Sequence, residues 1–279
     1  MNWNIDFISQ NDFENHVAHT ILYYGEKLAS YDIAKFNANL IDPIKLIFDK
    51  FVYDKSWKEL INSEIFRQRD KSNTNEIGYF HQRIFRYINN CRVPDNGKDG
   101  GWDIICDFPD GYEISDSEIV HTIFIEMKNK HNTMNSSSAG KTYIKMQNQL
   151  LKADDCACFL VEAIASTSQN IVWKTTVDGQ KVFHSKIRRM SIDRFYEMVT
   201  GDTEAFLKIC LALPNTIKGV LSKTSSNIKP PLDTVYEELQ AKAVNFHKMS
   251  EDAAMTMSLY MLGFGEYLGF NKFSGFLTR

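Results

Sequence analysis

Apolar residues recur every three or four positions through much of the amino-terminal part of the chain. This spacing places them on one face of a helix and predicts helices within residues 13–28, 44–51 and 57–69. The polar residues 70–75 interrupt the pattern, and a further helix is expected from residue 77 to about residue 89. The chain therefore begins with a set of packing helices.

The middle of the chain changes to the two-residue alternation of β-strands. In WDIICDF, Trp102 and Ile104 alternate with Asp103 and Ile105, which predicts a strand over residues 102–108. After a turn at Asp110-Gly111, the expected elements are a strand at about 120–128, a helix from 138 or 140 to about 152, a strand at 156–163, a hairpin turning at Asp178-Gly179, and a helix at about 191–200. This order predicts an α/β fold with a mixed sheet flanked by helices.

From residue 202 onward the pattern is again mostly helical, with a loop at residues 222–231. The chain has 279 residues, of which 43% are hydrophobic, so it can bury a full core. We expect one domain with a helical part at 1–60, a catalytic α/β core at 61–200 and a second helical part at 201–279.

The composition indicates a cytoplasmic protein. No apolar run approaches the roughly 18 residues of a membrane span, and the start MNWNIDFISQNDF lacks the basic and apolar regions of a signal peptide. The five cysteines are scattered and include no C-x-x-C pair, which argues against disulfides and against zinc. They are expected to be buried free thiols.

The charge is unevenly distributed, although the net charge is only −3. Lysine and arginine dominate residues 65–92, 126–152 and 181–194, whereas residues 93–125 hold eight acidic residues and one lysine. A phosphate-binding surface around an acidic cation site would have this distribution. Solvated faces of ordinary helices and loops would produce the same pattern, so charge alone leaves both interpretations open.

The segment EMKNKHNTMNSSSAGKTY, residues 126–143, allows a nucleotide-binding interpretation because Gly140-Lys141-Thr142 resembles the end of a P-loop. Asn135, however, occupies the position of the first glycine, and the apolar strand that follows leads into Glu162. We therefore expect no nucleotide cofactor. The serines at 136–138 then serve as helix caps, and Lys141, Lys145 and Lys152 form one basic stripe on the following helix.

The beginning of the same segment favours metal-dependent phosphodiester hydrolysis. Glu126 and Lys128 lie on one face of a strand, and Asp103 on the preceding strand supplies a second carboxylate. Two carboxylates and a substrate phosphate can hold Mg²⁺, which would activate water for in-line attack and leave a 3′-hydroxyl and a 5′-phosphate. A neighbouring lysine can orient that water or stabilise the developing negative charge. Asp103, Glu126 and Lys128 are thus the predicted catalytic residues.

A longer set of sequence motifs carries a family resemblance. GWDIICDF, FIEMKNKHNTMNSSS and KTYIKMQNQLLKA, with EIFRQRDKSNTNEIGYFHQRIF before them and MSIDRFYEMVTGD after them, resemble the type II restriction endonucleases of the Eco-forty-seven-two family, which is similar to the SinI-type enzymes. The resemblance extends from about residue 42 to about residue 214.

The resemblance implies a PD-(D/E)xK restriction-endonuclease-like fold and Mg²⁺-dependent cleavage of both DNA strands at a short palindrome of the GGNCC type, or its GGWCC subset. The family motif maps onto Asp103, Glu126 and Lys128. One difference is that Trp102, rather than proline, precedes the aspartate. Such an enzyme belongs to a restriction-modification system with a cognate DNA methyltransferase.

Several other residues are candidates for the site. Glu64 lies on the apolar side of a predicted helix and could complete the metal site, or it could pair with an arginine in a structural role. Glu162 is a weaker candidate. His81 and His131 could position water or phosphate, although packed or surface roles are the more common ones for histidine.

DNA contacts are expected from residues that surround the catalytic motif. Arginine and lysine can pair with guanine in the major groove, and some of these contacts would reach phosphate only. The candidate DNA-binding residues are Lys130, His131, Asn132, Asn135, Ser136, Lys141, Lys145, Lys186, Arg188 and Arg189.

A palindromic target implies a two-fold symmetric protein, so a homodimer is expected. Residues 232–247 and 253–268 are suited to dimer or DNA contacts. A nuclease of the same fold that recognises branched DNA, and a DNA-binding module without catalysis, are the alternative interpretations.

Overall fold

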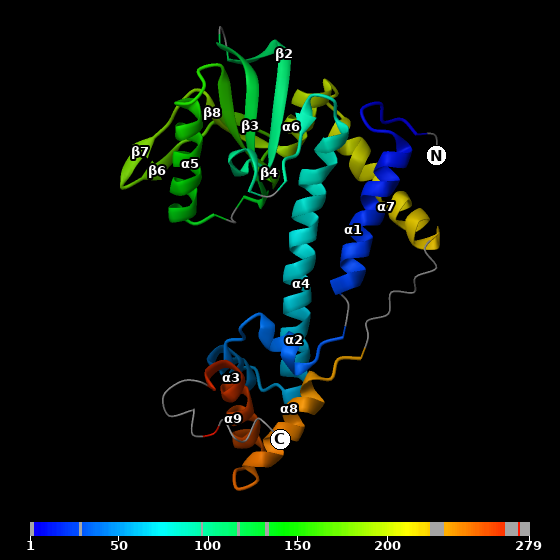
Figure 1. The fold of residues 1–279 in the computed structure, drawn as a ribbon, viewed down its shortest axis with the longest axis vertical. Coiled ribbons are helices and arrows are strands. Elements are labelled where there is room, and N and C mark those ends of the chain that lie inside the picture. Colours follow the sequence, from blue (N-terminus) through cyan, green and yellow to red (C-terminus); the bar gives the residue numbers. More distant parts are fainter. Residues whose placement is uncertain are drawn as a thin grey trace. The chain divides into compact units, whose positions relative to one another are not determined.

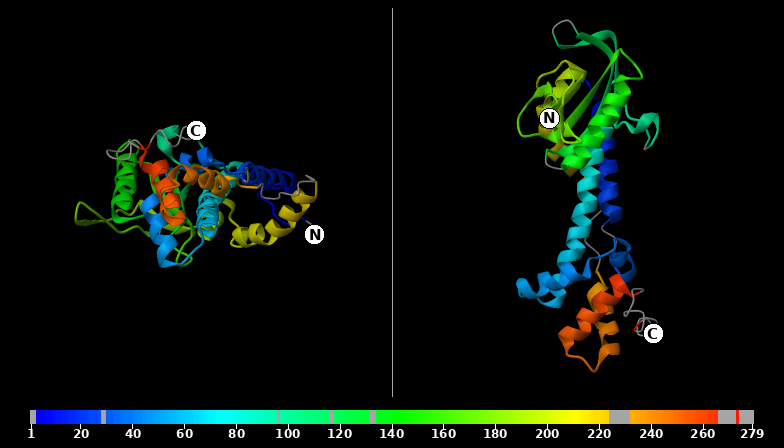
Figure 2. Two further views of the ribbon diagram at one scale, coloured as in Figure 1. Left: turned by 90° about the horizontal axis from the view of Figure 1, so that it is seen from below. Right: turned by 90° about the vertical axis from the view of Figure 1, so that its left-hand side faces the viewer.

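The computed structural model describes residues 3–27, 30–95, 97–115, 118–131, 134–223, 232–265 and 273 (Figures 1 and 2). The chain forms two compact units, one of Met1–Leu22 with Asn75–Ser226 and the other of Tyr23–Thr74 with Asn227–Arg279. Each unit is built from two segments that are far apart in sequence, whereas the three expected parts were each one continuous segment.

The first unit contains a six-stranded mixed sheet (Figure 1). Its strands follow the order β1 (Cys91–Arg92), β2 (Ile104–Ser115), β3 (Glu118–Lys130), β4 (Cys156–Ile164), β8 (Ile187–Ser191) and β5 (Asn170–Val172). The first three strands pair antiparallel, β3, β4 and β8 pair in parallel, and β5 is antiparallel to β8. The prediction of an α/β fold with a mixed sheet is confirmed.

Helices cover both faces of this sheet (Figures 1 and 2). On one face, α5 (Ser136–Leu150) buries Tyr143 and Met146 against strand residues. On the other face, α1 (Gln10–Lys27), α6 (Ile192–Thr200) and α7 (Ala205–Lys223) contribute to a second apolar cluster. Strand β4 is buried on both faces over most of its length, as expected for a central parallel strand.

The second unit is helical. Its elements include α2 (Ile33–Ala38), α3 (Pro43–Val52), α8 (Val235–Ala243), the short η3 (Val244–Phe246) and α9 (Glu251–Phe264). Their apolar faces and the amino-terminal turns of α4 (Trp57–Arg83) enclose one core. The residues of this core that are least exposed include Phe36, Leu60, Ile61, Val235, Leu239 and Leu259.

The expected break at residues 70–75 is wrong, because α4 continues through it from Trp57 to Arg83 and leads into the 3₁₀ turn η1 (Ile84–Tyr87). The segment contains polar residues but neither glycine nor proline. Polar residues cost a helix only tenths of a kcal/mol each, roughly, whereas proline costs about 3 kcal/mol. The apolar pattern is lost at residues 70–75 because this stretch of α4 has no buried face, and not because the helix ends there.

The expected turn at Asp110-Gly111 is also wrong. Strand β2 continues to Ser115, and its pairing with β3 shifts register between Asp107 and Tyr112. Gly111 has φ +80° within this irregular segment, so the glycine serves a β-bulge instead of a reversal of the chain. The hairpin turn at Asp178-Gly179 is confirmed, since it joins β6 (Thr175–Val177) to β7 (Gln180–Val182).

Helix α7 is long and apolar enough to pass a length and composition test for a membrane span. Three of its residues, Ala205, Ile209 and Val220, pack into the apolar cluster beside the sheet. The helix also contains Pro214, and its Lys208 forms an ion pair with Asp202.

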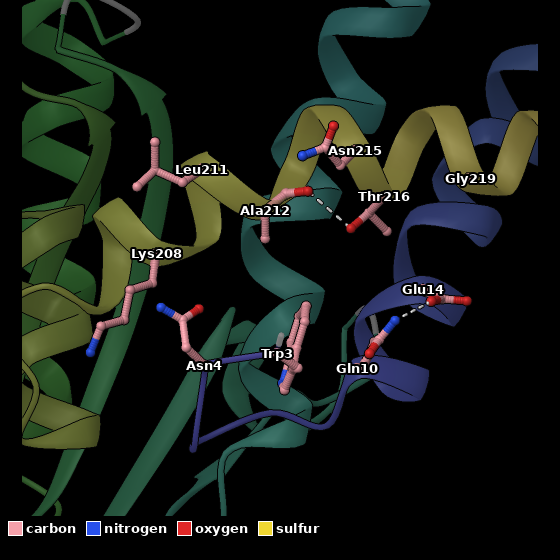
Figure 3. Close-up of a pocket in the computed structure, with 10 residues that line it drawn as sticks. All are labelled: Trp3, Asn4, Gln10, Glu14, Lys208, Leu211, Ala212, Asn215, Thr216 and Gly219. Atoms are coloured by element: carbon pink, nitrogen blue, oxygen red, sulfur yellow. Dashed lines mark hydrogen bonds between the residues drawn. The ribbon is translucent and has the colours of Figure 1, made fainter. Parts of the chain in front are cut away.

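A hollow of about 470 Å³ lies between α7 and the amino-terminal segment (Figure 3). Trp3, Gln10 and Glu14 line it on one side, and Leu211 and Asn215 on the other. None of the predicted catalytic residues lines this hollow.

All five cysteines are free, as expected, and four of them are buried. Cys210 on α7 is the exception, because it is exposed. A lone thiol on an amphipathic helix has no sequence signal that fixes which side it occupies.

The steric role of Gly111 in the bulge can be tested by comparison with Gly179, which has nearly the same φ. A Cβ on Gly111 would lie 2.4 Å from Cγ2 of Ile119, whereas a Cβ on Gly179, at φ +79°, would meet nothing within 4 Å. Both alanine variants should lose about 1 kcal/mol of unfolding free energy from the positive φ, and Gly111→Ala about 1 kcal/mol more from the clash. Urea denaturation measures both, and equal losses would contradict the steric role of the bulge.

Candidate active site

The predicted catalytic residues come together where β2 begins beside the carboxyl end of β3. Ile104 pairs with Ile125, so the preceding residue, Asp103, lies opposite Glu126. The Asp103 amide donates to the Ile125 carbonyl at 3.0 Å, which extends the pairing by one step. Glu126 lies on the face that α5 covers, where it contacts Lys145, and its charge acts on the neighbouring Asp103 carboxyl group.

The residue before Asp103 departs from the expected alternation. Trp102 was expected on the same face as Ile104, yet it packs with Phe124 on the α5 face, with ring centroids 5.4 Å apart. Ile104 joins the opposite cluster. The strand begins only at Ile104, so the two-residue period does not apply to Trp102.

Asp103 is fixed by two donors. Its Oδ2 accepts from the Met127 amide at 2.7 Å, and its Oδ1 accepts from Nε2 of Gln82 at 3.1 Å. Gln82, on the part of α4 that belongs to this unit, also donates to the Asp103 carbonyl at 3.1 Å. Burial and the nearby charge of Glu126 raise the pKa of Asp103, and this outweighs the opposing effects of the Met127 amide and of Lys128.

Gln82 was missed by sequence reasoning. It lies near the end of α4, within the stretch EIFRQRDKSNTNEIGYFHQRIF, but its contact with Asp103 depends on how that helix packs beside the sheet. The sequence offers no signal for this contact.

Glu126 is only 14% exposed, and each of its oxygens is bound by a different lysine. Lys128 Nζ donates to Oε1 at 2.7 Å and Lys145 Nζ donates to Oε2 at 2.8 Å. Burial acts to raise the pKa of Glu126, but the two ammonium groups together outweigh it, so the pKa is lowered. Glu126 is therefore ionised at neutral pH.

Lys145 was predicted as a DNA-binding residue within a basic stripe; in the structure its ammonium group contacts Glu126, and its role in DNA binding stays a prediction. It projects from α5, donates to the Gly101 carbonyl at 2.7 Å, and holds its Nζ 4.2 Å from the centroid of the Trp102 ring. Lys141, one turn earlier on α5, is exposed, and Lys152 lies beyond the helix, which ends at Leu150.

The donor set suits a hard divalent cation. Two neighbouring carboxylates are half-buried, and Mg²⁺ is commonly bound by one or two carboxylates, with water and substrate phosphate completing its shell. Across the described parts of the chain, no cluster of three or more His, Cys, Asp or Glu side chains forms a metal site. Asp103 and Glu126 therefore fit such an ion as a two-carboxylate site.

Glu64 belongs to the helical unit, whereas Asp103 and Glu126 belong to the unit that contains the sheet. Glu64 is buried in the helical unit, where its oxygens accept from Nε of Arg67 at 2.7 Å and from Nε2 of Gln68 at 3.2 Å. This is the arginine pairing that the alternative interpretation described. A metal-binding role for Glu64 stays a prediction.

The two histidines have different surroundings. Burial lowers the pKa of His81 to about 4, so it is neutral at pH 7, and its ring contacts Phe80 edge-on. His131 Nδ1 lies 3.1 Å from Oε2 of Glu162.

Glu162 is the centre of a second polar cluster. It lies on β4 directly beside Lys128 of β3, and its carboxylate is fully buried. Arg189 of β8 donates through Nε to Oε2 at 3.0 Å and through NH2 to Oε1, and its NH2 also lies 2.9 Å from Nδ1 of His131. Arg189 and His131, which are partly exposed, thus form one network with the buried Glu162.

The other predicted DNA-binding residues differ in their surroundings. Arg188 donates to the Asn170 side chain at 2.7 Å, and Lys186 Nζ donates to the Asp154 carbonyl at 2.7 Å. Asn135 caps α5 by accepting from the Ser138 amide at 2.9 Å, a role that was expected of the serines. Lys130 ends β3 and Ser136 begins α5, whereas Asn132 lies outside the described residues.

Comparisons with known proteins show which family this chain belongs to. Residues 5–222 match a model of the Eco47II restriction endonuclease family. The type II restriction enzyme Sau96I of Staphylococcus aureus is 26% identical over 256 residues, which cover 89% of this chain and 93% of that enzyme. The type II restriction enzyme Eco47II of Escherichia coli is 28% identical over 231 residues, covering 78% and 89% of the two chains.

The network around the buried Glu162 gives a stability prediction. Arg189→Met leaves a fully buried carboxylate without its cation and should cost about 3–5 kcal/mol of unfolding free energy. Arg194→Met breaks a surface pair with Glu197 and should cost far less, because solvent screens an exposed ion pair. Chemical denaturation measures both losses.

A double variant separates charge from packing in the same experiment. Arg189→Met combined with Glu162→Gln removes the uncompensated charge, so it should recover part of the loss seen with Arg189→Met alone. A double variant at least as unstable as the single one would show that the arginine acts through packing and not through the Glu162 charge.

Proposed function

We propose that this chain, which belongs to the Eco47II restriction endonuclease family, cleaves both strands of DNA at a short palindrome of the GGNCC type in a Mg²⁺-dependent reaction. Membership in the family makes it a restriction endonuclease, a site-specific hydrolase whose partner is DNA. One observation carries the proposal for the site: Asp103, Glu126 and Lys128 gather at the meeting point of β2 and β3.

Type II restriction enzymes generally use divalent metal ions, and oxygen ligands of this kind favour Mg²⁺. Asp103 and Glu126 would hold the ion. When bound, it would neutralise charge on the scissile phosphate and make water a better nucleophile at neutral pH.

Groups of the protein would orient the metal ligands and the attacking water. The Met127 amide and Gln82 fix the two oxygens of Asp103, so this carboxylate is oriented before any ligand binds. Lys128, held 2.7 Å from Glu126, would orient the attacking water and stabilise negative charge at the phosphorus. In-line attack would leave a 3′-hydroxyl and a 5′-phosphate.

The fold supports an assignment to the PD-(D/E)xK nucleases. In this unit a mixed sheet flanked by helices carries the aspartate at the start of one strand and the E-x-K motif on the neighbouring strand. We further infer that the enzyme acts as a homodimer on its palindromic site, in the cytoplasm, beside a methyltransferase that protects the host DNA.

Digestion of DNA tests the activity and the target together. Purified protein with Mg²⁺ should cut plasmid DNA into discrete fragments, and sequencing of the fragment ends should place every cut within a GGNCC site. Fragments cut at unrelated sequences would contradict the specificity. Cleavage of branched but not linear DNA would instead support a structure-specific nuclease.

The role of Lys128 is tested by separating binding from cleavage. Lys128→Ala should lower the cleavage rate about a hundredfold or more and keep specific binding in a gel shift, because the lysine acts on charge that develops during the reaction. Lys181→Ala, which removes an exposed lysine from β7, should cleave like the wild type. A Lys128→Ala enzyme that cleaves at the wild-type rate would remove this lysine from the mechanism.

A further inference from the structure

The Glu126 carboxylate contacts two lysines, and the predicted catalytic set includes only one of them, Lys128. Lys128 occupies Oε1, and Lys145 of α5 occupies Oε2. The two lysines are about equally accessible, at 30% and 31% exposed, and each lies at hydrogen-bond distance from the carboxylate. Both oxygens of this carboxylate are therefore already in contact with positive charge.

Lys145 differs from Lys128 in what else holds it. Its ammonium group also donates to the Gly101 carbonyl at 2.7 Å and lies over the Trp102 ring. A carbonyl oxygen and the face of an indole ring both stabilise an ammonium ion without a carboxylate. Lys145 can therefore give up Glu126 and keep two of its three favourable contacts.

A metal ion at Glu126 would meet this ammonium directly. Mg²⁺ binds oxygen at about 2.0–2.1 Å, and an ammonium group on the same oxygen would bring two cations within a few ångström of each other. Like charges at such a distance in a half-buried site repel strongly. Metal binding through Oε2 and the Lys145 contact are therefore in competition.

We propose that Lys145 is a positioning residue that occupies the Glu126 carboxylate in the DNA-free protein and lowers its affinity for divalent metal ions. The inference rests on the proposed function, because it takes Asp103 and Glu126 as the metal ligands. Lys145 balances the buried charge of Glu126 until a metal ion displaces it.

Metal titration of the DNA-free protein tests the competition without a readout of activity. The probe is Mn²⁺, which shares the preference of Mg²⁺ for oxygen ligands and whose free ion is measured by electron paramagnetic resonance. Lys145→Met should tighten Mn²⁺ binding about tenfold, within the range typical of coupled binding. Lys145→Arg, which retains the positive charge, should bind Mn²⁺ like the wild type.

Two further variants serve as controls for this titration. Lys141→Met removes a lysine from an exposed position one turn earlier on α5, so its Mn²⁺ affinity should stay close to that of the wild type. Lys145→Gln, which keeps a donor for the Gly101 carbonyl, repeats the test if circular dichroism shows that the methionine variant is unfolded.

The outcomes separate this inference from the proposed function. A wild type that cleaves DNA, with Lys145→Met and Lys145→Gln binding Mn²⁺ no more tightly than it does, would overturn the competition and leave the nuclease assignment intact. Equal tightening by Lys141→Met would also overturn it, because the effect would then be one of net charge. A wild type that neither binds Mn²⁺ nor cleaves DNA would overturn the proposed function itself.

Discussion

The candidate site depends on the burial of two carboxylates side by side at the start of β2. Ionised groups are costly to remove from water, so each must be compensated by donors or by opposite charge. Asp103 receives a backbone amide and the Gln82 side chain, and Glu126 receives two lysines. Burial acts to raise the pKa of both carboxyl groups, but it prevails only at Asp103, because the two lysines outweigh it at Glu126 and lower the pKa there.

Much of the sheet, including the pairing partners β2 and β3, could be predicted from sequence, because alternation in β3 and the apolar run in β4 are local signals. The contacts that complete the site could not be predicted in this way. Gln82 reaches Asp103 only through the packing of α4, and Lys145 reaches Glu126 only through the placement of α5. Both are ordinary polar residues of amphipathic helices, and which strand residue they meet is decided by tertiary structure.

Basic residues were the least predictable part of the chain. Arg188, Arg189 and Lys186 stood out as candidates for base recognition, yet each has a partner within the protein. Sequence shows where positive charge occurs but not whether a neighbouring strand uses it. Arg189 illustrates the point, because Glu162 lies one strand away in the sheet and 27 residues away in the chain. Internal use of a cation does not prevent a phosphate contact, but it fixes the direction in which the side chain can reach.

The sheet ends on both sides in very short strands, β1 with two residues and β5 with three. A long unpaired strand at such an edge would offer backbone amides and carbonyls to another chain and so invite aggregation. At the β5 side the short strand presents few of these groups. At the other side β1 pairs only with Ile105 and Cys106 of the twelve-residue β2, so most of the outer edge of β2 has no strand partner among the described residues. The sheet is therefore blunted by a short strand at one edge only, beside a central strand, β4, that is almost entirely apolar.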